Sequence, residues 1–226
     1  MLSTLSNTPS DETGVPDAIP STRERLLAAA MRLFGEKGYM STSVADVLAE
    51  ANVNSGSLYH FFPGKQDLLL AVLEMYRTGI GRMLLAPAWE DVEDPIEKVF
   101  ALLGRYRQNI VETDASYGCP IGSLSLELHE PDPVVRKALA DNFNAWIDAV
   151  EGCLVTAGSR LPSEINRREL AEFVFTTTQG GVMLARTHRD VRHFDGAVRQ
   201  LRGYFAYLES AAATPKRETV GKPRAK

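Results

Sequence analysis

Residues 55–60 (SGSLYH) carry the groups best suited to bind a nucleic acid. Small residues at the start of a short helix allow close approach to a duplex, and the free backbone N–H groups there favour phosphate. Tyr59 and His60 can reach phosphate oxygens or base edges, although Tyr59 can also pack partly beneath its helix and His60 can be a bystander. Thr42 or Ser43 can cap a preceding helix that points at the same DNA backbone. Lys65 can bind a phosphate as a point charge.

Cys119 is a second residue that could carry out chemistry, because it lies between Gly118 and Pro120 at the start of a predicted helix. A helix N-terminus stabilises a thiolate and lowers the thiol pKa, which would make Cys119 a nucleophilic sensor. The alternative is a small buried residue that lines a pocket or the core, the commonest state of a free cysteine. Cys153 lies in the middle of a predicted helix and is expected in the core.

A pair of short helices must position residues 55–60. The residues expected to face the inside of this pair are Val44, Val47 and Leu48 on the first helix, Val53 in the turn, and Leu58 with Phe61 or Phe62 on the second. This spacing is typical of a helix-turn-helix, whose second helix lies in the major groove. A helical pair with a polar outer face also occurs in α-proteins that bind no DNA, so the spacing alone leaves both interpretations open.

The periodicity is helical nearly throughout residues 21–211, and no alternating run is long enough to predict a strand. We therefore expect an all-α fold of about nine helices. They span roughly 22–37, 43–50, 54–62, 65–84, 95–113, 120–128, 133–157, 162–186 and 192–211, with Pro87 ending the fourth. The expected units are a disordered tail (1–20), a three-helix helix-turn-helix domain (21–66), a helical bundle for effector binding and dimerisation (67–211) and a disordered basic tail (212–226).

The composition fits a globular protein of ordinary kind. The chain has 226 residues, of which 44% are apolar and 24% charged. Its formal net charge of −4 gives no direct support for DNA binding and does not exclude it, because an acidic domain can mask a local basic face. We find no membrane span or signal peptide in the sequence and expect a cytoplasmic protein with no membrane partner. Two cysteines cannot make a disulfide framework.

Residues 22–77 closely resemble the N-terminal domain of the TetR/AcrR family of repressors. The matching pieces are RLLAAAMRLFGEKGY, TSVADVLAEANVNSGSLYHFF and the KQDLL that follows. The resemblance implies a homodimeric regulator of transcription, a ligand-released repressor of a palindromic double-stranded operator, with activation as an alternative. By position it implies DNA contacts for Thr42, Ser43, Ser55, Gly56, Ser57, Tyr59, His60 and Lys65. Asn54 and Gly64 depart from the commonest pattern, and Gly64 leaves the fourth helix without a side-chain cap.

The C-terminal half resembles one subgroup of this family, whose members respond to small organic or electrophilic compounds. The similar stretches are GCPIGSLSLELHEPDPVVRKAL and TTQGGVMLAR. A pocket for a small effector is expected between the helices, mostly apolar with a few polar groups. Its expected residues are Cys119, Tyr106, Phe143, Trp146, Phe175 and Gln179, with Trp89, Tyr117 and Phe173 as further candidates. Aromatic residues at helical spacing are also common in ordinary cores. The resemblance further implies a dimer interface of four helices, built from residues 163–186 and 192–211.

Two other classes of function compete with this one. In an enzyme, Cys119 with His129 or His188 would form a nucleophile and base, but no third group stands at a recognisable spacing. Gly122-Ser123 lacks the flanks of a nucleophile elbow, and no cysteine and histidine spacing predicts zinc. We therefore expect no catalytic residue, metal or cofactor. The other class is an interaction module without operator binding, against which the intact turn and polar helix face argue.

Overall fold

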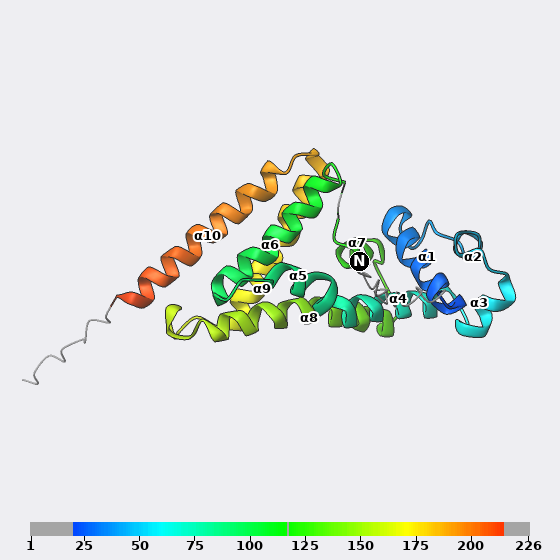
Figure 1. Ribbon diagram of the computed structural model, residues 1–226, viewed down its shortest axis with the longest axis horizontal. Coiled ribbons are helices and arrows are strands. Elements are labelled where there is room, and N and C mark those ends of the chain that lie inside the picture. Colours follow the sequence, from blue (N-terminus) through cyan, green and yellow to red (C-terminus); the bar gives the residue numbers. More distant parts are fainter. Residues whose placement is uncertain (1–19, 117, 215–226) are drawn as a thin grey trace, which may run out of the picture.

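The computed structural model describes residues 20–116 and 118–214, and this part of the chain is helical with no strand (Figure 1). Its α-helices are α1 (Thr22–Lys37), α2 (Val44–Ala51), α3 (Ser55–Phe61), α4 (Lys65–Ile80), α5 (Ala86–Trp89), α6 (Pro95–Glu112), α7 (Pro120–Glu127), α8 (Pro133–Thr156), α9 (Arg167–His188) and α10 (Arg192–Ala213). A π-helical turn (Gly81–Leu85) joins α4 to α5, so α4 and α5 form one continuous helix and the described residues hold nine helices in all. The predicted all-α class is confirmed. The two predicted tails lie almost wholly outside the described residues.

Short-range capping sets most of the helix boundaries. Ser21 and Glu24 form a capping box at the start of α1, which ends at Gly38 with a φ of 88°. Asp94 and Asp132 cap α6 and α8 by accepting backbone N–H bonds, and a proline follows each at the first helical position. These local signals explain why the bounds predicted for the helices over 22–37, 95–113 and 133–157 agree with α1, α6 and α8 within a residue.

Two predicted boundaries were wrong. Pro87 does not end the fourth helix, because it occupies the first turn of α5, directly after the π-helical turn, and the helix continues to Trp89. The helix predicted to start at Pro162 begins instead at Arg167, where Asn166 supplies the cap. The Arg167 guanidinium donates to the carbonyls of Pro162 and Ile165 and holds the preceding segment out of the helix.

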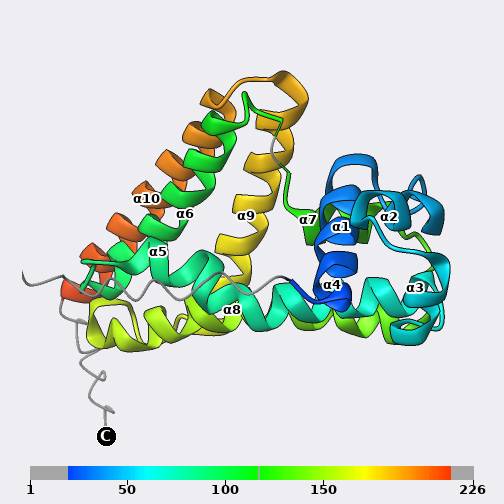
Figure 2. The same cartoon turned by 45° about the vertical axis from the view of Figure 1, so that its right-hand side comes forward.

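The helices enclose two apolar cores, one at each end of the molecule (Figure 2). The first core is built from α1–α3 and the first half of α4, and it also takes in Ile121 and Leu124 of α7 and Val135 and Leu139 of α8. The second core is built mainly from α6, α8, α9 and α10. Figure 2 shows α4 and α8 side by side between the two ends. Among the described residues, we find no helix long and apolar enough to cross a membrane.

Candidate nucleic-acid interface and internal cavity

The turn between α2 and α3 is fixed by side chains on both sides of it. Ser43 caps α2 in a capping box with Asp46, and the hydrogen bonds from Ser43 hold the pKa of the Asp46 carboxyl below its ordinary value. The helix ends at Asn52, which has a left-handed φ of 51°. From α1, the Arg25 guanidinium donates to the Ala51 carbonyl at 2.6 Å and to the Asn52 carbonyl at 2.5 Å. The two carbonyls lie 26 and 27 residues from Arg25 in the sequence, so no local pattern indicated that Arg25 holds this turn.

The helix α3 presents the predicted polar residues outward. Asn54 caps it by accepting from the Ser57 backbone N–H at 3.0 Å. Leu58 is fully buried and Phe62 nearly so, whereas Phe61 is exposed, so Phe62 is the inward residue of the two that the sequence left open. Ser55, Gly56, Tyr59 and His60 are exposed, with Tyr59 at 59%. Their exposure leaves backbone donors, hydroxyls and an imidazole free on one surface.

Thr42 was expected to face DNA, and its burial corrects that expectation. Its side chain is fully buried, and its hydroxyl donates to the Gly38 carbonyl at 2.7 Å. The residue that caps α2 at the surface is Ser43, which is exposed. The Thr42 side chain therefore holds the loop between α1 and α2 instead of contacting a partner.

Lys65 also has an internal partner that the sequence did not indicate. Its ammonium donates to the Tyr39 carbonyl at 2.5 Å and lies 4.1 Å from the centroid of the Tyr39 ring. Burial lowers the pKa of this half-buried lysine. A phosphate contact by Lys65 would have to compete with these interactions, so its main work in the free protein is to fix the loop before α2.

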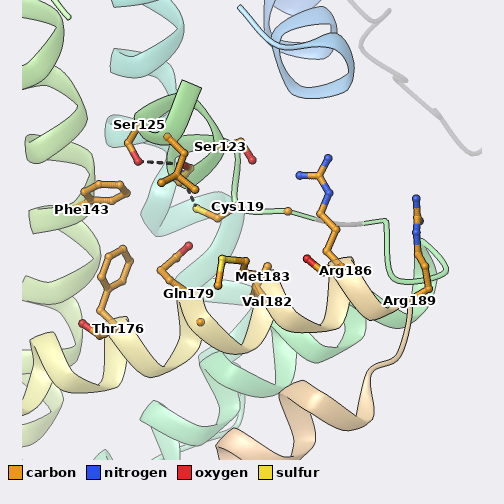
Figure 3. Close-up of a pocket in the computed structure, with 16 residues that line it drawn as sticks. Cys119, Ser123, Ser125, Phe143, Thr176, Gln179, Val182, Met183, Arg186 and Arg189 are labelled. Carbon is orange, nitrogen blue, oxygen red and sulfur yellow. Dashed lines mark hydrogen bonds between the residues drawn. The ribbon is translucent and has the colours of Figure 1, made fainter. Parts of the chain in front are cut away.

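A cavity of about 840 Å³ lies between α7, α8 and α9 (Figure 3). Cys119 and Gly122 line its α7 side, Phe143 its α8 side, and Phe175 and Gln179 its α9 side. A second cavity of about 310 Å³ shares Cys119, Phe143 and Phe175 with the first and is also lined by Tyr106 and Trp146. All six residues predicted for the effector pocket thus line one or both cavities.

The cavities combine a cluster of tilted aromatic rings with buried donors. The Phe175 ring lies 5.2 Å from Phe143 and 5.1 Å from Trp146, centroid to centroid. Trp146 Nε1 and Gln179 Nε2 are buried without a hydrogen-bond partner among the described residues. A buried donor left unpaired costs about 1–3 kcal/mol, so both donors favour an occupant that brings acceptors.

The Cys119 thiol caps α7 and accepts from the Gly122 backbone N–H at 3.4 Å. Burial raises the pKa of this thiol, and the weaker opposing effect of the hydrogen bond from the Gly122 backbone N–H does not cancel it. The expectation that the helix N-terminus would lower the pKa of Cys119 was therefore wrong. The competing thiol–base arrangement finds no support in the geometry, since the ring of His188 stacks on His193 at 4.2 Å and His129 is exposed.

The remaining pocket candidates lie elsewhere. Trp89 donates from Nε1 to the Lys98 carbonyl at 2.9 Å and packs against the second core. Phe173 is exposed and meets Tyr204 edge-on, away from both cavities. Tyr117 lies outside the described residues.

Two family models match the chain. Residues 26–72 match the model described as bacterial regulatory proteins, tetR family, and residues 95–200 match the C-terminal domain of LmrA/YxaF-like transcriptional regulators. An uncharacterized HTH-type transcriptional regulator of Mycobacterium tuberculosis is 32% identical over 187 residues, which cover 80% of this chain and 92% of the relative. The HTH-type transcriptional repressor DhaR of Mycobacterium sp. is 27% identical, covering 76% of this chain and 86% of DhaR.

Solved structures show the same fold. A regulatory protein TetR from Rhodobacter sphaeroides superposes with a TM-score of 0.71 at 25% identity, covering 80% of this chain and 96% of that one. The reduced form of NemR from E. coli superposes with a TM-score of 0.69 over 80% of this chain and 95% of that one, and at 21% identity this likeness concerns the fold alone.

The raised pKa of Cys119 predicts a thiol that is alkylated slowly at neutral pH. In Cys153→Ser protein at pH 7.5, iodoacetamide should alkylate Cys119 at least about ten-fold more slowly than it alkylates the same residue in urea, because only the thiolate reacts and burial depletes it. The rate in the folded protein should still rise above pH 9. Mass spectrometry of quenched samples measures both rates. A folded rate that equals the unfolded one, with a plateau below pH 8, would show an activated thiol instead.

Proposed function

The chain belongs to the TetR family of bacterial transcriptional regulators, and from this premise we propose that it binds operator DNA as a homodimer and is released by a small molecule in the cavity beside α7. The observation that carries the DNA-binding half is the exposed face of α3 over its buried Leu58 and Phe62. The proposal assigns no catalytic residue. A role on DNA supports a cytoplasmic protein, and the relative named a repressor supports repression over activation.

The contacts with DNA would come from the N-terminal ends of α2 and α3. Ser43 would contact DNA through its hydroxyl at the first. At the second, Ser55 and Gly56 offer backbone N–H groups, and Ser57, whose N–H is bonded to Asn54, would contact DNA through its hydroxyl oxygen. Tyr59 and His60 stand further along α3 and would reach the groove. Two copies of α3 in a dimer would have to meet successive major grooves, roughly 34–36 Å apart.

Tyr59→Ala tests this surface. The substitution removes an exposed ring, so folding should be unchanged while binding to the protein's own upstream DNA weakens by about 1–3 kcal/mol. Fluorescence anisotropy at several salt concentrations measures the affinity, which should fall steeply as salt rises. Val111→Ala on α6, also exposed, is the control and should bind as the parent does. Equal affinity of Tyr59→Ala and parent would place the DNA contacts elsewhere.

The proposed dimer interface is the outer face of α9 and α10. Exposed apolar side chains collect there, and they are Phe173 and Leu184 on α9 and Tyr204 and Tyr207 on α10. Phe173 and Tyr204 already meet edge-on, 5.8 Å between centroids, so the two helices present one continuous surface. Large exposed apolar patches of this kind usually mark an interface.

Phe173→Glu combined with Leu184→Glu should weaken the dimer by at least about ten-fold, because two charges would be buried without partners at the interface. Light scattering and sedimentation over a concentration series measure the association. Val134→Glu changes an equally exposed apolar residue at the start of α8 and should leave the dimer intact. A double variant that associates as tightly as the parent would exclude this face.

The proposed effector is a flat aromatic molecule with at least two hydrogen-bond acceptors. The tilted rings of Phe143 and Phe175 line both cavities and would contact its aromatic part. The unpaired donors of Gln179 in the larger cavity and Trp146 in the smaller would bind its acceptors. A cavity of about 840 Å³ is within the range that encloses drug-sized ligands. To release DNA, the effector must bind the DNA-incompetent conformation more tightly than the competent one.

Gln179→Leu tests whether Gln179 donates a hydrogen bond to the ligand or only supports the structure. For an aromatic ketone that releases the parent from DNA, the variant should bind about ten-fold more weakly, because one hydrogen bond is lost. Its own thermal stability should not fall, since the substitution removes a buried unpaired N–H. Calorimetry gives both values, and the exposed Gln108→Leu is the control. Undiminished ligand affinity with lower stability would contradict the assignment.

A further inference from the structure

The short helix α7 touches both halves of the molecule. Ile121 and Leu124 on its inner side belong to the first core, with α1 and α4. Gly122, Ser123 and Ser125 on its other side line the large cavity (Figure 3). In Figure 2 this helix lies between α9 and the α1–α3 end of the molecule. A single rigid element of eight residues therefore forms part of the cavity wall and part of the DNA-binding unit.

The last residue of α7, Glu127, holds the loop that precedes α2. Its carboxylate accepts the Tyr39 backbone N–H at 2.9 Å and the Met40 backbone N–H at 2.6 Å. The loop backbone comes so close that a Cβ at Gly38 would lie 2.9 Å from Glu127 Oε1, and Gly38 also has a left-handed φ of 88°. Only glycine satisfies both conditions. Charge-assisted bonds to two consecutive N–H groups fix the loop in position as well as in orientation.

The same loop is held from the opposite side by α4. Lys65 donates to the Tyr39 carbonyl, while the Tyr39 ring meets Phe34 edge-on at 5.2 Å. Ser43, the cap of α2, follows directly after the buried Thr42, and the far end of α2 is fixed by Arg25. The loop thus transmits its position to α2 and, through the fixed turn, to α3.

The first turn of α7 lies close to one side chain of the opposite cavity wall, Gln179 on α9. A Cβ at Gly122 would lie 2.9 Å from Gln179 Oε1 on α9 and 3.4 Å from Cys119 Cβ. Figure 3 shows Gln179 directed from α9 toward Cys119. An occupant that binds Gln179 therefore lies directly against the first turn of α7, which has the same side chain as a near neighbour.

We propose that Glu127 is a positioning residue through which α7 couples occupancy of the cavity to the placement of α2 and α3. This inference rests on the proposed function. It adds a second connection beside α4, which belongs to the first core and packs along α8 toward the other end of the molecule. Movement of the Cys119 end of α7 would carry the Glu127 end with it, since one unbroken helix joins them. Coupling between two sites is reciprocal, so DNA bound at α3 must also change the cavity end of α7.

The reciprocal effect supplies a test that needs no effector. In Cys153→Ser dimers the one remaining thiol is Cys119, and its rate with 5,5′-dithiobis(2-nitrobenzoic acid) is measured with and without the upstream duplex that the parent binds. Bound duplex should slow the reaction by roughly five-fold in the parent, and by less than about two-fold in Glu127→Ala. The control Glu130→Ala removes a nearby exposed carboxylate and should keep the full effect. If Glu127 only supports the structure, its loss should change the rates with and without duplex by the same factor and leave their ratio unchanged.

Each outcome decides between the two hypotheses. If Glu127→Ala keeps the parent's ratio of Cys119 rates without and with duplex, Glu127 has no coupling role and α4 remains as the connection. If the parent binds no upstream duplex, the proposed function is contradicted, and a measurement without DNA then tests the coupling. Modification of Cys119 with N-ethylmaleimide should speed amide hydrogen exchange at residues 38–40 in the parent. Unchanged exchange overturns the inference. If Glu127→Ala does not fold, Glu127→Gln replaces it, and its one remaining acceptor oxygen should restore part of the ratio.

Discussion

The packing of α4 against α8 joins the two ends of the molecule, and one buried amide fixes how they meet. Asn142 on α8 donates from Nδ2 to the Leu73 carbonyl on α4 at 3.0 Å. Sliding either helix would break this bond and leave Nδ2 only its bond to the Ala138 carbonyl on α8, a net loss of about 0.5–1.5 kcal/mol. Asn142 also lines the smaller cavity beside Phe143 and Trp146. The bond that sets the register of α4 and α8 therefore also sets where the cavity lies relative to α1–α3.

Away from this interface, charged side chains hold the backbone where helices end. Arg25 satisfies carbonyls at the end of α2, Arg167 those before α9, and Glu127 the N–H groups before α2. Loop N–H and carbonyl groups need partners when the loop is partly buried, and an ionised side chain can satisfy several at once. The helix-turn-helix unit is thus held by side-chain bonds to backbone, from Arg25 and Glu127, in addition to its apolar core.

Local signals made most of the fold predictable, and long-range contacts account for the errors. Ser21, Glu24 and Gly38 are near neighbours of the helix they delimit, so the sequence contained the bounds of α1. The sequence predicted the outward face of α3 from the helical spacing of the inward residues around Leu58. Glu127 bonds a loop 87 and 88 residues away, and nothing around residue 127 distinguishes it from any other glutamate near a helix end. Thr42 was misjudged for a related reason: its partners are the Leu33 and Gly38 carbonyls, which become near neighbours only once the loop has folded.

Cys119 shows how burial can reverse a conclusion drawn from sequence. Position at the start of a helix favours the thiolate, yet enclosure between α7 and α9 removes water from it, and the second effect is larger. A thiol that stays protonated acts first as the cap of α7 through the Gly122 N–H. An occupant beside Gln179 therefore meets the first turn of α7 whether or not it reacts with sulfur. Reversible binding is enough to act on α7, and a covalent bond to Cys119 would only prolong the same displacement.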